Sequence, residues 1–389
     1  MNIENNHFRR DFFKSAGLGI ALATIPGKLF SQKKLESLPA MNTGLLNICD
    51  FGARADGSTD NTTAIRRAID VAAKTGATVL IPPGTFLTST LKLYPHVGLL
   101  GYPAWSYRNF GGSVLRLNNE HAKCLLDITG AYGATVHGLC LDGAGLGENI
   151  HGIFLDKPDY GKQEDTPLVE GCRISHFSGD SIRLSRVWCF RIRSCMLSHC
   201  GGNGLYVRGW DGFILDNWFS GNRGAGFSAT EENASNTLTG NRIEWNRSGG
   251  IVVSGGNNYN ITGNYIDRSG GPAISLFNNS HDFAMTGNMI YRSGKPEWTS
   301  LDNNDSTHVK IENGAGIVFT GNSLRAGCDD GGKGEYSPAN AIVLSNLRNC
   351  IIKDNAMHNG ALKNLLLDLG NNDENVIIKD NVGQLLTAR

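Results

Sequence analysis

The chain lacks an excess of charge of either sign, since 36 Lys and Arg balance 36 Asp and Glu among its 389 residues. A neutral protein has no global field to attract nucleic acid, and we predict no such partner. Long hydrophobic runs are also missing: the best, Ser15 to Ile25, is too short to span a bilayer, so no membrane association is predicted for the mature protein. The nine cysteines form no CxxC pair, which argues against zinc, and no metal or cofactor is predicted.

The chain instead contains a short sequence motif that ends in Asn or Cys and recurs about every 23 residues. Its members are Cys172, Cys195, Asn217, Asn241, Asn264 and Asn288, and after longer gaps Asn322, Asn355 and Asn381, with Cys140 as a plausible first member. A fixed period of this size indicates stacked supersecondary units. We call these residues the ladder and interpret them as structural. Their side-chain amides would hydrogen-bond to one another along the stack, and the Asn residues would take the left-handed backbone conformation of sharp bends. Ladder cysteines are predicted to be small packing residues, with a Cys195–Cys200 disulfide as the alternative.

Counting from each ladder residue n, apolar side chains recur at n−3, n+2, n+10 and n+12, as in Ile192, Leu197, Ile182 and Leu184. Pairs separated by one variable residue show strand alternation, and the long 3.6-residue periodicity of a helical solenoid is absent. Gly and Asn clusters mark the bends. The sequence therefore predicts an all-β, single-stranded parallel β-helix, in which ten coils at roughly 4.8 Å make a rod about 45 Å long.

The first 31 residues have a different character. Arg9-Arg10 precede Phe12-Phe13-Lys14 and the short apolar run, in the order of a twin-arginine export signal, which they resemble. The alternative is a chance Arg pair before an N-terminal helix. We predict a signal over residues 1–31, a linker over 32–46 and the β-helix over 47–389. The resemblance implies the twin-arginine translocase as a partner and a periplasmic or secreted location.

Residues 47–101 are predicted to cap the solenoid. Asp60 or Asn61 is a suitable N-cap for an amphipathic helix from about Thr62 to Lys74, and Gly76 is a suitable residue just after it. The phrases FGARADGSTDNTTAI and VLIPPGTF resemble the start of the right-handed β-helices of the pectate-lyase and polygalacturonase superfamily. That resemblance implies a right-handed coil with an N-terminal capping helix. The catalytic Asp phrases of polygalacturonases are missing from the coils, which argues against their mechanism.

A second resemblance covers about residues 135–245. The phrases HGLCLDGAG and GFSATEENASNTLTGNRI are similar to inulin fructotransferases, which cleave a fructan by intramolecular transfer. The family's acid–base machinery would correspond to Glu231 and Glu232 here. The sequence departs from the family at Ala225, where an Asp is expected.

Register arithmetic brings several outward-facing side chains of neighbouring coils into one patch about 10 Å long. As catalytic candidates it contains Glu231, Glu232 and Asp211, and as substrate contacts Arg183, Tyr206, Arg208 and Trp210. Sugar recognition uses aromatic faces and charged groups, and glycosidic cleavage uses carboxyl groups. The competing interpretation is a set of surface salt bridges of little energetic value.

Three lengthened coils, with extra residues within 143–168, 293–310 and 327–338, are predicted to form the walls of a groove. His151 and His308 in them are candidate bases, and His151 is also assigned to the substrate. Asp302 to Asp305 only loosely resembles a calcium loop. The remaining charged or aromatic residues noted there are Asp142, Asp159, Trp298, Asp329, Asp330, Glu335 and Tyr336.

Taken together, these patterns predict an exported carbohydrate-active enzyme that cleaves a polysaccharide or oligosaccharide, as a lyase or an intramolecular glycosyl transferase. A glycoside hydrolase on the same fold and a non-catalytic glycan-binding β-helix are the alternatives. A homotrimer, as in related β-helix families, would build the site between subunits.

Overall fold

The computed structural model describes residues 44–102, 106, 111–294, 303–327 and 337–387. The chain divides into two units, Met1–Thr43 and Gly44–Arg389, and the account below concerns the second. The export signal and nearly all of the linker fall outside the described residues. No helix among the described residues is long and apolar enough to cross a membrane.

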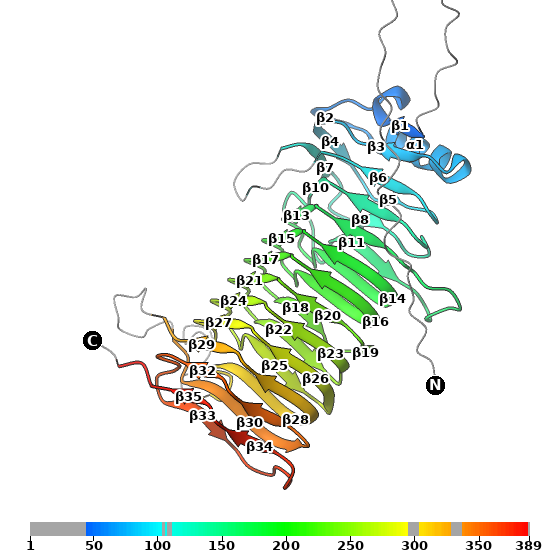
Figure 1. Ribbon diagram of the computed structural model, residues 1–389. Helices are drawn as coiled ribbons and strands as arrows, with labels where there is room; N and C mark the ends of the chain where they lie inside the picture. Colours follow the sequence, from blue (N-terminus) through cyan, green and yellow to red (C-terminus); the bar gives the residue numbers. More distant parts are fainter. Residues whose placement is uncertain (1–43, 103–105, 107–110, 295–302, 328–336, 388–389) are drawn as a thin grey trace, which may run out of the picture. The chain divides into compact units, whose positions relative to one another are not determined.

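The described residues form two parallel sheets that wind around one axis, as the stacked arrows of Figure 1 show. The second, narrower sheet has 13 strands: β2 (Asp56–Asp60), β4 (Gly84–Thr88), β7 (Ser113–Leu117), β10 (Leu139–Asp142), β13 (Arg173–Ser175), β15 (Met196–Ser198), β17 (Trp218–Ser220), β21 (Arg242–Glu244), β24 (Tyr265–Asp267), β27 (Met289–Tyr291), β29 (Ser323–Arg325), β32 (Ala356–Met357) and β35 (Val382–Gly383).

The first sheet contains 22 strands and supplies two of the three sides of each coil. These strands are β1 (Leu45–Asn47), β3 (Thr78–Leu80), β5 (Leu91–Lys92), β6 (Gly98–Leu100), β8 (Cys124–Asp127), β9 (Thr135–His137), β11 (His151–Asp156), β12 (Leu168–Glu170), β14 (Ile182–Arg193), β16 (Leu205–Leu215), β18 (Ala225–Ala229), β19 (Asn233–Ala234), β20 (Thr237–Thr239), β22 (Gly249–Ser254), β23 (Asn257–Thr262), β25 (Ile274–Phe277), β26 (Ser280–Thr286), β28 (Thr307–Thr320), β30 (Asn340–Arg348), β31 (Ile351–Lys353), β33 (Asn364–Asp368) and β34 (Ile377–Lys379).

Every strand pairs in parallel with its equivalent one coil away, so the predicted β-helix is confirmed. Ile182 of β14 lies opposite Leu205 of β16, and Leu205 lies opposite Phe227 of β18. The predicted apolar positions are buried: Ile192 at n−3, Leu197 at n+2 and the pair Ile182/Leu184 are all fully inaccessible to solvent. Burial of these columns in one continuous core is the main favourable term in stacking coils.

The predicted capping helix is α1 (Thr62–Thr75), after a single 3₁₀ turn η1 (Ile48–Phe51). Asp60 accepts a hydrogen bond from the Thr62 N–H at 2.9 Å, which satisfies one free donor of the first turn. Asn61 instead accepts from the Arg54 N–H at 2.7 Å. Gly76 ends the helix with φ +71°, in the left-handed region that favours glycine, and its N–H bonds to Ala72.

The asparagine ladder is structural, as predicted, and its members are buried except for the partly exposed Asn381. From Asn241 onward, each carboxamide oxygen accepts from the backbone N–H and the Nδ2 of the ladder residue one coil earlier, as Asn241 does from Asn217 at 3.0 and 3.1 Å. The Asn217 oxygen accepts from the Cys195 N–H. Each Nδ2 also donates to a carbonyl of the preceding coil, for example Asn241 to Ile214 at 2.9 Å. The same bonds continue through Asn264, Asn288, Asn322, Asn355 and Asn381.

The prediction that the ladder asparagines adopt the left-handed backbone is wrong. The residue immediately before each one takes it, for example Asp216 at φ +55° and Gly240 at φ +68°. The asparagine is free to point inward because its neighbour makes the bend.

A second, shorter ladder was not predicted. Asn222 accepts from the Cys200 N–H, and Asn246 accepts from Asn222. Cys195 and Cys200 are both free thiols, so the alternative of a disulfide between them is wrong; Cys200 instead contacts the Ser181 hydroxyl.

The first insertion is part strand and part loop. Residues 151–156 form β11, which pairs with β8 and β14, and the loop follows from Lys157. In the other two insertions, Trp298, Asp302, Asp329, Asp330, Glu335 and Tyr336 lie outside the described residues. The loosely predicted calcium loop is described from residue 303 onward, and its Asp305 accepts a hydrogen bond from Lys310 at 2.7 Å.

Candidate functional site

The outer face of the first sheet carries two columns of side chains, set by strand alternation. In one column Arg183 of β14 lies opposite Tyr206 of β16, which lies opposite Ser228 of β18. In the other, Ser185 lies opposite Arg208. Side chains two residues apart on a strand point to the same face, so Tyr206 and Arg208 both face outward.

Two adjacent carboxylates converge on Arg208. Its Nη1 lies 3.3 Å from a Glu231 oxygen and its Nη2 lies 3.0 Å from a Glu232 oxygen. Tyr206 donates its hydroxyl hydrogen to the other oxygen of Glu231 at 2.5 Å. The side chains of Glu231 and Glu232 are 51% and 58% exposed, so both carboxylates are open to a ligand while their positions are fixed from beneath.

An aromatic pair forms the wall beside these carboxylates. Tyr160 stacks on Trp210 with ring centroids 3.9 Å apart, and its hydroxyl donates to Glu232 at 3.3 Å. Tyr160 was missed by the sequence analysis, although its loop belongs to the first insertion. We call Tyr160, Tyr206, Arg208, Trp210, Glu231 and Glu232 the carboxylate cluster.

The loop that carries Tyr160 is held by ion pairs at both of its ends. The Lys157 ammonium lies 2.8 Å from the Asp165 carboxylate, and both groups are buried. Arg186 pairs with Asp156 at 2.9 Å and donates to the Lys157 carbonyl. Breaking a buried pair by removing one partner is costly, so the loop is a fixed wall of the site.

The tyrosine hydroxyls act here as hydrogen-bond donors. Burial, followed by the hydrogen bond to Glu231, raises the pKa of Tyr206 to about 12. Burial, followed by the charge of Glu232, raises the pKa of Tyr160 to about 12. Both phenols therefore stay protonated at neutral pH and hold the carboxylates in place.

Arg183 has a supporting position. Its guanidinium lies 4.0 Å from the centre of the Tyr206 ring and pairs with Asp180 at 3.0 Å. Asp180 is buried and also accepts two hydrogen bonds from Asn203. Arg183 thus fixes the ring that holds Glu231, and its own charge is already balanced.

Asp211 and the two histidines are not brought into the cluster. Asp211 occupies a left-handed corner with φ +59°, and within the described residues no hydrogen bond or ion pair joins it to Glu231 or Glu232. His151 is only 3% exposed, and its Nδ1 accepts the Asp180 N–H at 2.9 Å. His308 is fully buried. Both histidines are thus buried away from the surface that carries the carboxylate cluster, and their roles as bases and the substrate contact of His151 stay predictions from the sequence.

A groove with a volume of about 870 Å³ opens farther along the same face. Its floor includes Val252, Ser275 and Lys310, which continue the column of Tyr206 and Ser228 coil by coil. Arg223 lies in its wall. The cluster and the groove therefore share one continuous sheet face.

The fold and this site define a right-handed β-helix protein. The chain belongs to the family described as the right handed beta helix region, whose model matches residues 158–234, 186–331 and 232–383 and so covers more than half of the chain. Residues 45–110 match a second family, described as rhamnogalacturonase A/epimerase, pectate lyase-like. The resemblance of the capping segment to that superfamily is confirmed.

Solved structures with this fold include the A-module of the Azotobacter vinelandii mannuronan C-5 epimerase AlgE4. It is 19% identical, with a TM-score of 0.62 over 87% of this chain and 97% of that one. The DFA-IIIase of Arthrobacter chlorophenolicus A6, in complex with GF2, is 16% identical, with a TM-score of 0.60 over 87% and 93%. The Agl-KA catalytic domain is 16% identical, with a TM-score of 0.61 over 90% and 69%.

Proposed function

We propose that the protein is a carbohydrate-active enzyme that cleaves a polysaccharide on the outer face of the first sheet, with Glu231 and Glu232 as its acid–base groups. The observation that carries the proposal is the fixed pair of exposed carboxylates on Arg208, on the same sheet face as an open groove. Glycosidic bonds are commonly cleaved by a pair of carboxyl groups. The similar structures named for a mannuronan epimerase and a DFA-IIIase add support for a carbohydrate substrate.

The cluster's charge favours a neutral glycan. Arg208 contributes one positive charge against two negative ones from Glu231 and Glu232, a net charge of −1, and the neighbouring Arg183 is neutralised by Asp180. A uronate lyase must bind the carboxylate of its substrate, and both guanidiniums here are already paired with protein carboxylates. This charge balance favours intramolecular glycosyl transfer over a lyase reaction.

In such a transfer, a hydroxyl of the substrate attacks the anomeric carbon as the glycosidic C–O bond breaks. One carboxylate takes the proton of the attacking hydroxyl, and the other, entering as the acid, gives a proton to the leaving oxygen. Arg208 holds both carboxyl groups, and the ring pair of Trp210 and Tyr160 offers an apolar surface for a sugar face.

Hydrolysis is the second candidate, since the exposure of Glu231 and Glu232 also admits water to the same carboxylates.

The proposal also includes export through the twin-arginine translocase to the periplasm or medium, and assembly as a homotrimer. Both points rest on the sequence alone. The mass of the purified protein in solution and its cellular fraction test these two points.

The test of the activity uses purified protein, a panel of fructans and uronate polymers, and mass detection of the products. Transfer gives a cyclic anhydride that is one water lighter than the oligosaccharide that hydrolysis would release, and a lyase gives an unsaturated end that absorbs in the ultraviolet. The double variant Glu231→Gln/Glu232→Gln should lose at least about 10²-fold in turnover at an unchanged melting temperature. Glu374→Gln, an exposed carboxylate elsewhere, is the matched control. Full turnover in the double variant would refute the assignment.

A further inference from the structure

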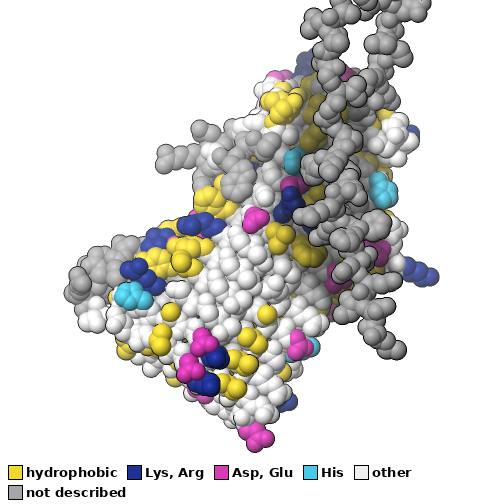
Figure 2. Space-filling view, viewed as in Figure 1, with side chains coloured by type: hydrophobic (Ala, Val, Ile, Leu, Met, Phe, Trp, Pro, Cys, Tyr) yellow, Lys and Arg dark blue, Asp and Glu magenta, His cyan; other side chains and the backbone are white. Residues whose placement is uncertain are grey.

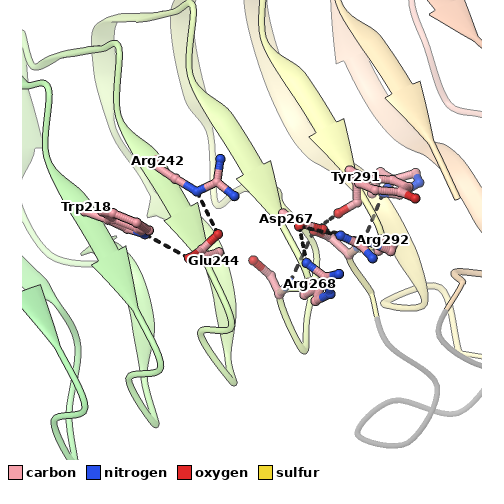
Figure 3. Close-up of polar contacts among 10 residues, drawn as sticks. Trp218, Arg242, Glu244, Asp267, Arg268, Tyr291 and Arg292 are labelled. Carbon is pink, nitrogen blue, oxygen red and sulfur yellow. Dashed lines mark hydrogen bonds and ion pairs between the residues drawn. The ribbon is translucent and has the colours of Figure 1, made fainter. Parts of the chain in front are cut away.

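Four successive coils each carry an arginine along the second sheet, outside the site described above. Arg242 and Arg325 lie on its strands β21 and β29, and Arg268 and Arg292 lie in the bends that follow β24 and β27. These arginines stand among aromatic rings of the same coils. We call the set the arginine–aromatic face; it comprises Trp218, Arg242, Trp245, Tyr265, Arg268, Tyr291, Arg292 and Arg325, and most of it is drawn in Figure 3.

Guanidiniums lie over rings throughout this face. Arg242 lies 5.6 Å from the centre of the Trp218 ring and 4.5 Å from that of Tyr265, so it sits between rings of the two neighbouring coils. Arg268 lies 4.6 Å from the Trp245 ring. Such contacts orient a guanidinium while leaving its charge in place.

The carboxylates of this face lie beneath the arginines. Glu244 is 7% exposed and accepts from Trp218 Nε1 at 2.9 Å and from Arg242 Nε at 2.8 Å. Asp267 is 1% exposed and pairs with Arg292 at 2.7 Å and with Arg268 at 2.6 Å. Four arginines against two carboxylates give a net charge of +2 among the described residues, and the negative groups are the buried ones.

The cations that reach solvent are well placed for a ligand. The Arg242 side chain is 44% exposed, and only its Nε bonds to Glu244. Arg325 is exposed and contacts the Tyr291 ring, with no carboxylate partner within the part of the chain that the structure describes. In Figure 2, dark blue and yellow side chains lie side by side on the left flank, where Figure 1 places the edge of the second sheet.

We propose that the arginine–aromatic face binds an anionic polysaccharide, carboxylated or sulfated, independently of the carboxylate cluster. Guanidiniums bind carboxylate and sulfate oxygens, and the exposed Trp245 ring offers a surface for a sugar face. The two exposed arginines, Arg242 of β21 and Arg325 of β29, lie three coils apart, which is about 14 Å along the axis at roughly 4.8 Å per coil. Two cations this far apart suit a polysaccharide with separated charges better than duplex DNA, which carries a charge every ~1.7 Å.

The experiment is affinity electrophoresis of the full chain in gels that contain dextran, dextran sulfate, polygalacturonate or duplex DNA. Dextran sulfate and polygalacturonate should retard the protein, neutral dextran should not, and about 1 M NaCl should abolish the effect by screening. Arg242→Gln and Arg325→Gln should each weaken retention about threefold to tenfold. Arg348→Gln removes an exposed arginine from the first sheet and is the matched control.

The double variant Glu231→Gln/Glu232→Gln should be retained like the wild type, which separates this surface from the catalytic proposal. Three results would overturn the inference: no retardation by either anionic polymer, equal loss of retention in Arg348→Gln and Arg242→Gln, or stronger retention by DNA than by both anionic polysaccharides.

Discussion

Replacement of one buried asparagine of the ladder by alanine should lower the free energy of unfolding by about 3–5 kcal/mol. Asn241 is 1% exposed and makes four side-chain hydrogen bonds. Its oxygen accepts from the N–H and Nδ2 of Asn217, and its Nδ2 donates to the Ile214 carbonyl and the Asn264 oxygen. Asn241→Ala removes the acceptor of two Asn217 donors and takes one donor from each of two acceptors, in a site closed to water. Each stranded donor costs about 1–3 kcal/mol, and the acceptors cost less because each keeps another donor or lone pair.

The assay is equilibrium urea denaturation followed by far-ultraviolet circular dichroism, with the midpoint and slope fitted together. Asn260→Ala is the matched control, because Asn260 is exposed on β23 and its loss should change the free energy of unfolding by less than about 0.5 kcal/mol. If Asn241→Ala unfolds within about 1 kcal/mol of the wild type, the ladder bonds do not stabilise the coil and the reasoning fails. A solenoid distributes stability between neighbouring coils, so a lower slope would report separate unfolding of the two ends.

Three further outcomes follow from the site and the core. Tyr160→Phe keeps the stack on Trp210 but removes the hydroxyl bond to Glu232, so turnover should fall about tenfold with the melting temperature unchanged; wild-type turnover would show that the bond is irrelevant. Trp210→Ala should raise KM more than it lowers kcat, and an unchanged KM would remove the ring pair from substrate binding. Burial lowers the pKa of His151 to about 4 and that of His308 to about 3. In the unfolded chain both histidines take up a proton near pH 6.5, so their contribution to folding stability is intact above that pH and is lost as the pH falls toward 4. The loss is up to ~1.4 kcal/mol per pH unit for each histidine. The free energy of unfolding, measured by denaturation from pH 7 to 4, should therefore fall less steeply with pH in His151→Gln, and an equal dependence on pH would contradict this.

The coil could be predicted because each apolar position is repeated in successive coils, and a period of about 23 residues leaves few other folds. The sequence predicted the correct residues for the ladder but assigned them the wrong backbone conformation. The signal for the left-handed residue was already present in phrases such as Thr239-Gly240-Asn241, where the glycine supplies the positive φ. An asparagine at the bend itself would point its amide away from the coil below.

Register arithmetic was also sufficient to bring Arg208 to Glu231 and Glu232, because these residues are about one period apart. It could not find Tyr160, which reaches Glu232 across 72 positions from a loop with no counterpart in the other coils. His151 was assigned to a loop because its segment breaks the period. That segment instead pairs as β11, and the histidine points into the core.

The convergence of Glu231 and Glu232 depends on the place where the repeat ends. Strand β18 stops at Ala229, so the alternation that would send adjacent side chains to opposite faces no longer applies at the carboxylates. In the bend both reach one guanidinium, and each takes a different phenol as its second partner: Tyr206 from the strand and Tyr160 from the loop. The regular strand thus sets Arg208 and Tyr206 in register, and the irregular segments add both carboxylates and the second phenol, Tyr160. A repeat alone would present identical rows of side chains, and it is the departure from the repeat that makes the two carboxylates chemically distinct.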